Sequence, residues 1–87
     1  MSSRLAEKSL LGSMLTEHHY ILDSDIRASY FRSHIHRNIY SAMRELARTN
    51  KPADHITLLT IRQHAQLGGA NYLAELKNFA HPPSRSF

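Results

Sequence analysis

The feature that most constrains the fold of this chain is an apolar stripe with the period of an α-helix. Ser33 precedes the stripe and can cap a helix, whereas Asn50 can take the left-handed conformation that ends one. Pro52 then prevents the helix from continuing. Residues at such spacings share one face, so the segment predicts an amphipathic helix with its apolar side in a core. The stripe consists of Ile35, Ile39, Ala42, Met43 and Leu46.

The other apolar residues also recur with helical spacing, and no segment alternates as a strand would. We expect four further helices, at about residues 5–15, 18–23, 55–66 and 71–79. The sequence therefore predicts an all-α protein, a compact bundle of about five short helices that forms one domain over residues 1–87. Residues 81–87 contain Pro82-Pro83 and are expected to begin a linker or the next element.

Some positions suit particular places in these helices. Ser3 is a candidate cap for the first helix, and Glu7 lies in its first turn, where the helix dipole favours a negative charge. Gly12 interrupts the same helix at a cost of about 1 kcal/mol relative to alanine, which indicates close approach of another element.

The second half of the chain contains similar signals. Asp54 is predicted to cap the helix that follows it, and Gly68-Gly69 to end that helix. The side chains that we expect in the core from the last two helices are Leu58, Ile61, Ala65, Tyr72, Leu73, Leu76 and Phe79.

Tyr30 and Phe31 form an adjacent aromatic pair beside basic residues. Such a pair could stack on single-stranded bases. We favour a hydrophobic plug instead, because aromatic burial is among the largest stabilising contributions that a small core has.

Composition excludes several classes of function. The chain has no Cys, so it forms no disulfide and no thiolate metal site. No glycine-rich loop precedes a lysine, which excludes ATP hydrolysis by these residues, and no cofactor is expected. No segment approaches the ~20 apolar residues of a membrane span, and the first residues do not form a signal peptide. We therefore expect a cytoplasmic protein without a membrane partner.

The seven histidines raise the question of a metal site. His34 and His36 are two residues apart, so a helix points them in directions ~200° apart, which is unsuited to one ion. His18 and His19 are adjacent and diverge likewise. Surface and cap positions are the ordinary interpretation of such histidines, and we predict neither a metal site nor a catalytic group.

Positive charge is concentrated in one stretch. Residues 27–51 hold six basic side chains and one acid, Glu45. Such a stretch can attract a polyanion by counterion release, or it can form a solvated face opposite an acidic partner surface. We favour the second interpretation, and the candidates for the exposed, partner-facing surface are Arg37, Arg44 and Arg48.

Several motifs then occur in a recognisable order. They are Ala6-Glu7 with Leu10-Leu11-Gly12, Tyr30-Phe31, His36-Arg37-x-Ile39-Tyr40, Pro52-Ala53-Asp54-x-Ile56-Thr57-Leu58, Gly68-Gly69-x-x-Tyr72-Leu73-x-x-Leu76, and Pro83-Ser84. In this order they resemble the N-terminal domain of DnaB-type replicative DNA helicases. The similarity covers almost the whole chain. The segments between Leu15 and Tyr30 and between Thr57 and Gly68 are shorter than the family pattern, which suggests a divergent member encoded by a phage, prophage or plasmid.

The resemblance implies a specific role. In this family the ATPase motor lies in a separate C-terminal domain, while the N-terminal domains pair and form a trimer-of-dimers collar on the hexameric ring. They also receive the C-terminal domain of DnaG-type primase, and helicase loaders influence the assembly. The chain would then be a non-catalytic module for homodimerisation and primase docking, with only indirect or weak contact with DNA.

Two alternatives remain at this stage. One is a stand-alone small basic DNA-binding protein that uses the stretch 27–51, for which a salt titration of DNA binding is the test. The other is a free-standing helicase-like head that regulates a helicase by pairing with it. A reading frame that continues into a phosphate-binding loop would distinguish the helicase module from this regulator.

Overall fold

A computed structural model describes residues 4–17, 20–23 and 26–79, and every regular element within them is a helix. The prediction of an all-α fold is confirmed. In chain order the elements are α1 (Arg4–Thr16), α2 (Tyr20–Asp23), the 3₁₀ helix η1 (Ala28–Tyr30), α3 (His34–Arg48), α4 (His55–Ile61), η2 (His64–Leu67), α5 (Ala70–Leu76) and η3 (Lys77–Phe79).

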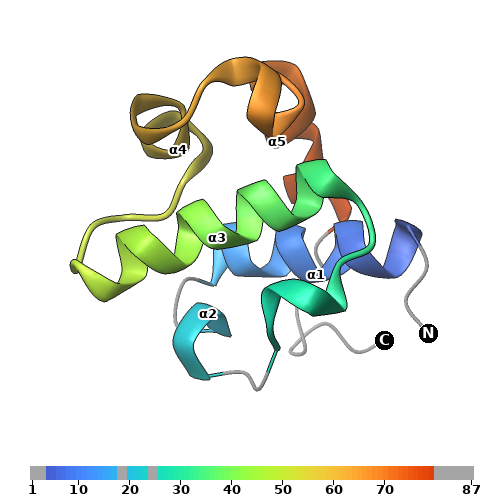
Figure 1. The fold of residues 1–87 in the computed structure, drawn as a ribbon, viewed down its shortest axis with the longest axis horizontal. Helices are drawn as coiled ribbons and strands as arrows, with labels where there is room; N and C mark the ends of the chain where they lie inside the picture. Colours follow the sequence, from blue (N-terminus) through green and yellow to red (C-terminus); the bar gives the residue numbers. More distant parts are fainter. Residues whose placement is uncertain (1–3, 18–19, 24–25, 80–87) are drawn as a thin grey trace.

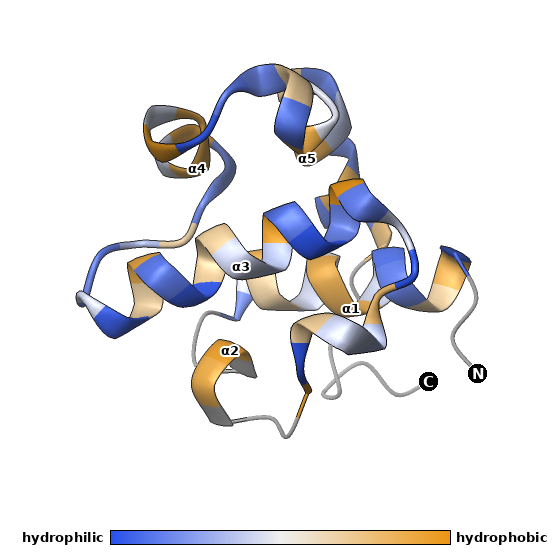
Figure 2. Cartoon of the chain, in the orientation of Figure 1, coloured by the Kyte–Doolittle hydropathy of each residue, from blue (hydrophilic) through white to orange (hydrophobic). Residues whose placement is uncertain are grey.

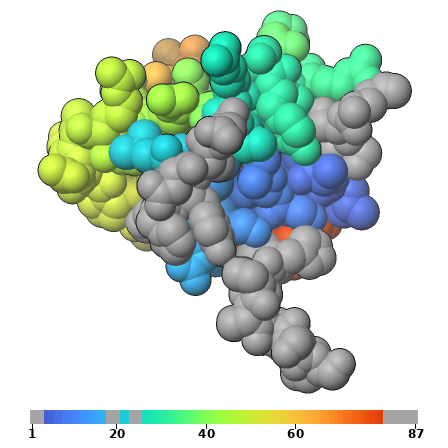
Figure 3. All heavy atoms as spheres, turned by 90° about the horizontal axis from the view of Figure 1, so that it is seen from below, coloured from blue at the N-terminus to red at the C-terminus, as the bar shows by residue number. Residues whose placement is uncertain are grey.

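The longest helix, α3, lies at the centre of the arrangement (Figure 1). It packs against α1, α2, α4, η1 and η2. The helices α4 and α5 lie on one side of α3, and α1 and α2 lie on the other (Figure 1). Figure 3, which views the molecule from below, shows α1, α2 and η1 together with parts of α3 on the face away from α4 and α5. The last described element, η3, returns to pack along α1.

The sequence pattern explains why α3 takes this place. Its hydrophilic and hydrophobic residues recur with the helical period (Figure 2), so one side can enter the core while the other meets water. The predicted stripe is buried except for Ile35, which is half-buried at the start of the helix. Tyr40 is also buried, and its hydroxyl donates a hydrogen bond of 2.6 Å to the Ile26 carbonyl, which satisfies the polar end of the ring.

Both ends of α3 are formed as predicted. The backbone N–H of His36 donates to Ser33 Oγ at 3.4 Å, so Ser33 caps the N-terminus. After the C-terminus, Asn50 has a φ of 61°. Asparagine tolerates this left-handed conformation better than most residues, and here it turns the chain toward Pro52 and α4.

The core is continuous across α1, α2, α3, α4, η2 and α5. Phe31, Ile39 and Leu76 are among the side chains in it, as expected, and Gly12 is buried within α1. The buried hydrophobic side chains are Leu11, Met14, Leu15, Ile21, Phe31, Ile39, Tyr40, Ala42, Met43, Leu46, Ala53, Leu58, Leu67, Leu73 and Leu76.

The prediction that Tyr30 and Phe31 together form a hydrophobic plug is correct for Phe31 and wrong for Tyr30. Phe31 is fully buried, but Tyr30 is 37% exposed and meets the Phe31 ring edge-on, with ring centroids 5.2 Å apart. The two residues end a short 3₁₀ turn and point in different directions, so only one can enter the core.

The predicted helix over residues 55–66 is also wrong in its second half. α4 ends at Ile61, Arg62 and Gln63 are extended, and the chain re-forms a 3₁₀ turn at His64–Leu67. β-Branched residues fill most of α4 and weaken its tendency to continue as a helix. As a result Ala65 is exposed rather than buried as predicted, and Leu67 is buried in the core instead.

The start and end of the other helices differ less from expectation. α1 extends one residue further at each end than predicted, and the proposed cap Ser3 lies outside the described residues. The second helix begins at Tyr20, and His18 and His19 also lie outside the described residues. The last predicted helix is divided between α5 and η3, with Tyr72 and Phe79 half-buried.

Candidate functional site

A buried polar network connects three helices of the fold. Glu7 on α1 is only 2% exposed, and it lies in the first turn, where the sequence predicted a favourable interaction of its charge with the helix dipole. One carboxylate oxygen accepts a hydrogen bond of 2.9 Å from the backbone N–H of Arg32. The other lies 2.8 Å from His36 Nδ1. The carboxylate is therefore removed from water but held by donors, as a buried charge requires.

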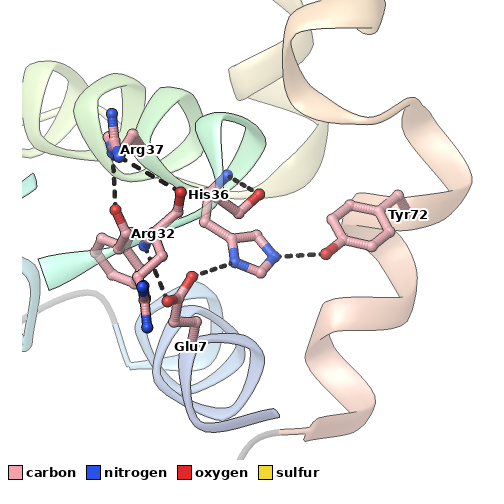
Figure 4. Close-up of polar contacts among 7 residues, drawn as sticks. Glu7, Arg32, His36, Arg37 and Tyr72 are labelled. Carbon is pink, nitrogen blue, oxygen red and sulfur yellow. Dashed lines mark hydrogen bonds and ion pairs between the residues drawn. The ribbon is translucent and has the colours of Figure 1, made fainter. Parts of the chain in front are cut away.

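His36 continues the network from α3 to α5. Its ring is fully buried, and its Nε2 lies 2.5 Å from the Tyr72 hydroxyl (Figure 4). The two rings are also stacked, with an interplanar angle of 12° and centroids 5.9 Å apart. Since a carboxylate only accepts hydrogen bonds, Nδ1 donates to Glu7, and in a neutral ring Nε2 accepts from the tyrosine. The order Glu7–His36–Tyr72 thus joins α1, α3 and α5.

This order of carboxylate, imidazole and hydroxyl resembles the order in hydrolytic triads, but its chemistry differs. Burial raises the pKa of the Tyr72 phenol above its usual value. Although His36 Nε2 could accept its proton, burial favours the neutral phenol, whereas a nucleophile is activated by a lowered pKa. The Tyr72 ring also packs closely against Gly68, so closely that a Cβ added at Gly68 would lie 2.8 Å from a ring carbon. The network is suited to holding helices together rather than to catalysis.

The prediction that the histidines occupy surface and cap positions is wrong for His36. The ~200° divergence along the helix holds, because His34 is exposed while His36 is buried. The ring enters the core because Glu7 and Tyr72 satisfy both of its nitrogens. Within the described residues no three His, Asp or Glu side chains gather closely enough to hold a metal ion.

The three arginines predicted to face a partner have different surroundings. Arg37 is exposed, but its Nε donates to the Phe31 carbonyl at 2.7 Å and its Nη2 to the Arg32 carbonyl at 3.4 Å. It therefore stabilises the turn before α3 (Figure 4). Arg44 is half-buried, with its guanidinium 6.0 Å from the Tyr40 ring centroid, whereas Arg48 is exposed.

Arg44 and Arg48 line a shallow hollow at the C-terminal half of α3. Its volume is about 590 Å³. Arg62, in the extended segment after α4, closes one side and donates to Glu45 at 3.0 Å. The remaining lining residues are Ser41 and Thr49. The sequence analysis placed Arg62 within a continuous helix over residues 55–66 and did not pair it with Glu45.

Sequence reasoning also missed Glu7 and His36 as partners. The signal was present, because both residues lie in motifs that carry the family resemblance, as does Tyr72.

The structure also describes residues that were predicted to have structural roles. Asp54 accepts from the Thr57 backbone N–H at 2.8 Å, and this hydrogen bond lowers the pKa of its carboxyl. Gly68 and Gly69 have φ of 83° and 96°, and they turn the chain from η2 into α5.

No helix among the described residues is long and apolar enough to cross a membrane.

One family model matches this sequence, that of the DnaB-like helicase N terminal domain, and the match covers residues 1–85. No curated protein matches the chain. The domain that this family describes is non-catalytic, and the 87 residues contain no ATPase domain.

Proposed function

Because this chain belongs to the family of DnaB-like helicase N-terminal domains, we propose that it is an assembly and docking module of a replicative DNA helicase. The family match over residues 1–85 is the observation that carries the proposal. The proposed role has two parts: pairing with a second copy, in a trimer of dimers within a hexamer, and docking of a DnaG-type primase. A helicase loader would act on the same assembly.

The distribution of polar groups supports a module that acts by contact. The buried polar residues Glu7 and His36 are used within the fold, where they connect its helices. By contrast, Arg44 and Arg48 have no acidic partner among the described residues. Exposed guanidinium groups are well suited to forming hydrogen-bonded ion pairs across an interface.

The pairing part is tested by the solution mass of the 87-residue chain, measured by light scattering over a range of concentrations. We expect the mass to rise toward twice the 10.0 kDa of one chain. A small domain leaves much surface exposed, so pairing is expected to be concentration-dependent. A mass that stays at one chain up to millimolar concentration would contradict pairing by this domain alone.

The docking part is tested with the C-terminal domain of the primase from the same replicon. Arg44→Glu with Arg48→Glu is expected to weaken its binding and to leave helicity unchanged. Arg37 is left intact, because its hydrogen bonds to the Phe31 and Arg32 carbonyls belong to the fold. Binding that is equally strong in the double variant would place the primase surface elsewhere.

A further inference from the structure

The hollow beside α3 has a chemical character of its own. The hollow is lined by three arginines, Arg44, Arg48 and Arg62, and by one acidic residue, Glu45. Arg44 and Arg48 are four residues apart on α3, so their side chains leave the same face one turn apart, about 6 Å at the Cβ atoms. The hollow therefore presents an ordered pair of cations rather than diffuse positive charge.

The arginines differ in how firmly they are held. Arg44 is half-buried, and its guanidinium lies over the Tyr40 ring, which limits its rotamers. Arg62 is held by its hydrogen bond to Glu45. The Arg62 side chain is 29% exposed and the Glu45 side chain is 55% exposed. Arg48 has no acidic partner in the part of the chain that the structure describes. A ligand thus meets the guanidinium groups of Arg44 and Arg62, which are already positioned, and that of Arg48, which is available to pair with it.

We propose that this hollow, lined by Arg44, Arg48 and Arg62, binds a helical segment of a partner protein that carries two acidic residues one turn apart. A carboxylate and a guanidinium form paired hydrogen bonds in one plane, which gives direction as well as attraction. Acidic residues four apart on a partner helix have the same spacing as Arg44 and Arg48. The proposal rests on the proposed docking function and names the chemistry of the docked segment.

The lining favours an acidic polypeptide over a nucleic acid. Glu45 stands among the arginines, and its fixed negative charge would repel a continuous phosphate backbone running through the hollow. Among the described residues no aromatic side chain lines the hollow, so bases would find no ring there to stack on. Isolated carboxylates, in contrast, can bind the arginines on either side of Glu45.

The test uses the 87-residue chain and a fluorescein-labelled, alanine-based helical peptide that carries two glutamates four residues apart. A second peptide has glutamine at both positions. We expect the glutamate peptide to bind with an affinity that falls as salt rises, and the glutamine peptide to bind at least about tenfold more weakly. Equal binding of the two peptides would overturn the proposal.

Variants of the chain locate the site. Arg44→Glu with Arg48→Glu is expected to weaken binding of the glutamate peptide at least about tenfold. The matched control is Arg27→Glu with Arg32→Glu, which changes the net charge equally at exposed positions outside the hollow. Glu45→Gln removes the competing carboxylate and is expected to tighten binding about two- to fivefold. An equal loss in the control pair would show that only net charge matters and would overturn the proposal.

Three further measurements locate the bound peptide and separate the two proposals. Amide chemical shifts of the unaltered chain are expected to move at residues 41–49 and 62 when the glutamate peptide is added, so the location does not depend on the folding of any variant. A twelve-residue oligothymidylate is the competing ligand, and tighter binding of it than of the peptide would overturn the proposal in favour of nucleic acid. Solution mass is recorded on the same samples. If the chain stays monomeric but still binds the glutamate peptide, only the proposed assembly role is overturned. If the chain pairs but does not bind the peptide, only the proposed site for an acidic segment is overturned.

Discussion

At the scale of single residues, the Glu7 carboxylate is the least expected feature of the interior. Removing a charged group from water is costly unless hydrogen bonds replace those it loses. Two donors from distant parts of the chain do so here, the Arg32 backbone N–H and the His36 ring. A buried group held in this way fixes how the helices are oriented as well as whether they touch, because its partners must lie in particular directions.

Glu7→Ala is therefore expected to be more destabilising than the removal of its side-chain volume would suggest. It leaves the buried His36 ring without its acceptor, which costs about 1–3 kcal/mol, and it also removes the acceptor of the part-buried Arg32 N–H. Tyr72→Phe, which removes only the outer hydroxyl, is expected to cost about 0.5–1.5 kcal/mol. The free energy of unfolding in urea measures both. A loss at Glu7 no larger than that at the exposed Glu75→Ala control would contradict the network's role.

At the scale of helices, α4 depends on its cap because it is short. The Asp54 carboxylate accepts from the Thr57 backbone N–H, and this hydrogen bond lowers its pKa. Asp54→Ala is expected to cost about 1 kcal/mol. Since the folded-state pKa is below the ordinary value of 3.8, this contribution is present above pH 3.8 and is lost as the pH falls through the folded-state pKa.

The unfolding free energies of the wild type and Asp54→Ala should accordingly converge in acid. The control is Asp54→Asn, which keeps a capping side chain but cannot titrate, and which should remain close to the wild type at neutral pH. A difference between wild type and Asp54→Ala that persists unchanged once the folded-state carboxyl is protonated would show that the carboxylate does not act through this hydrogen bond.

The turn between η2 and α5 depends on two glycines in different ways. Both have positive φ, which alanine adopts only with strain. A Cβ on Gly68 would also lie 2.8 Å from the Tyr72 ring, whereas a Cβ on Gly69 would meet nothing within 4 Å. We expect Gly68→Ala to be destabilising because its Cβ displaces Tyr72, and Gly69→Ala because its φ of 96° with a ψ of 160° is a conformation that essentially only glycine adopts, at a cost of about 1–3 kcal/mol. Thermal unfolding of the two variants measures both losses, and a melting temperature equal to that of the wild type for either variant would contradict the expectation.

Helices that rest on local signals were predictable from the sequence, and contacts between distant residues were not. The stripe of α3, its Ser33 cap and the Asp54 cap each depend on residues within a few positions of one another. Glu7 and His36 are 29 residues apart, so no local pattern reveals that they meet. The break after Ile61 was missed for a related reason, since the pairing of Arg62 with Glu45 on α3 depends on the folded arrangement.

At the scale of the whole molecule, stability depends on α3 because most other elements pack against it. Ile39 is fully buried on this helix. Ile39→Ala is expected to cost about 2–5 kcal/mol, a large part of what a domain of this size has. Arg48→Ala, on the exposed side of the same helix, should change stability by less than about 0.5 kcal/mol.

Far-UV circular dichroism and tyrosine fluorescence are expected to report the same unfolding transition for Ile39→Ala as for the wild type, shifted to lower urea. The core is continuous across the helices, so none of them should unfold separately. Two separate transitions in the variant would show that α4 and α5 form a unit independent of the rest.

The packing of η3 along α1 has a consequence for synthesis. α1 is translated before the other described helices, but η3 packs along it and Lys8 Nζ lies 5.1 Å from the centroid of the Phe79 ring, so the packing of α1 is completed only by the last described residues. A nascent chain that stops before η3 leaves part of the apolar surface of α1 uncovered. The domain is therefore expected to reach its native state on the ribosome only after residue 79 has emerged from the exit tunnel, in one late step rather than helix by helix.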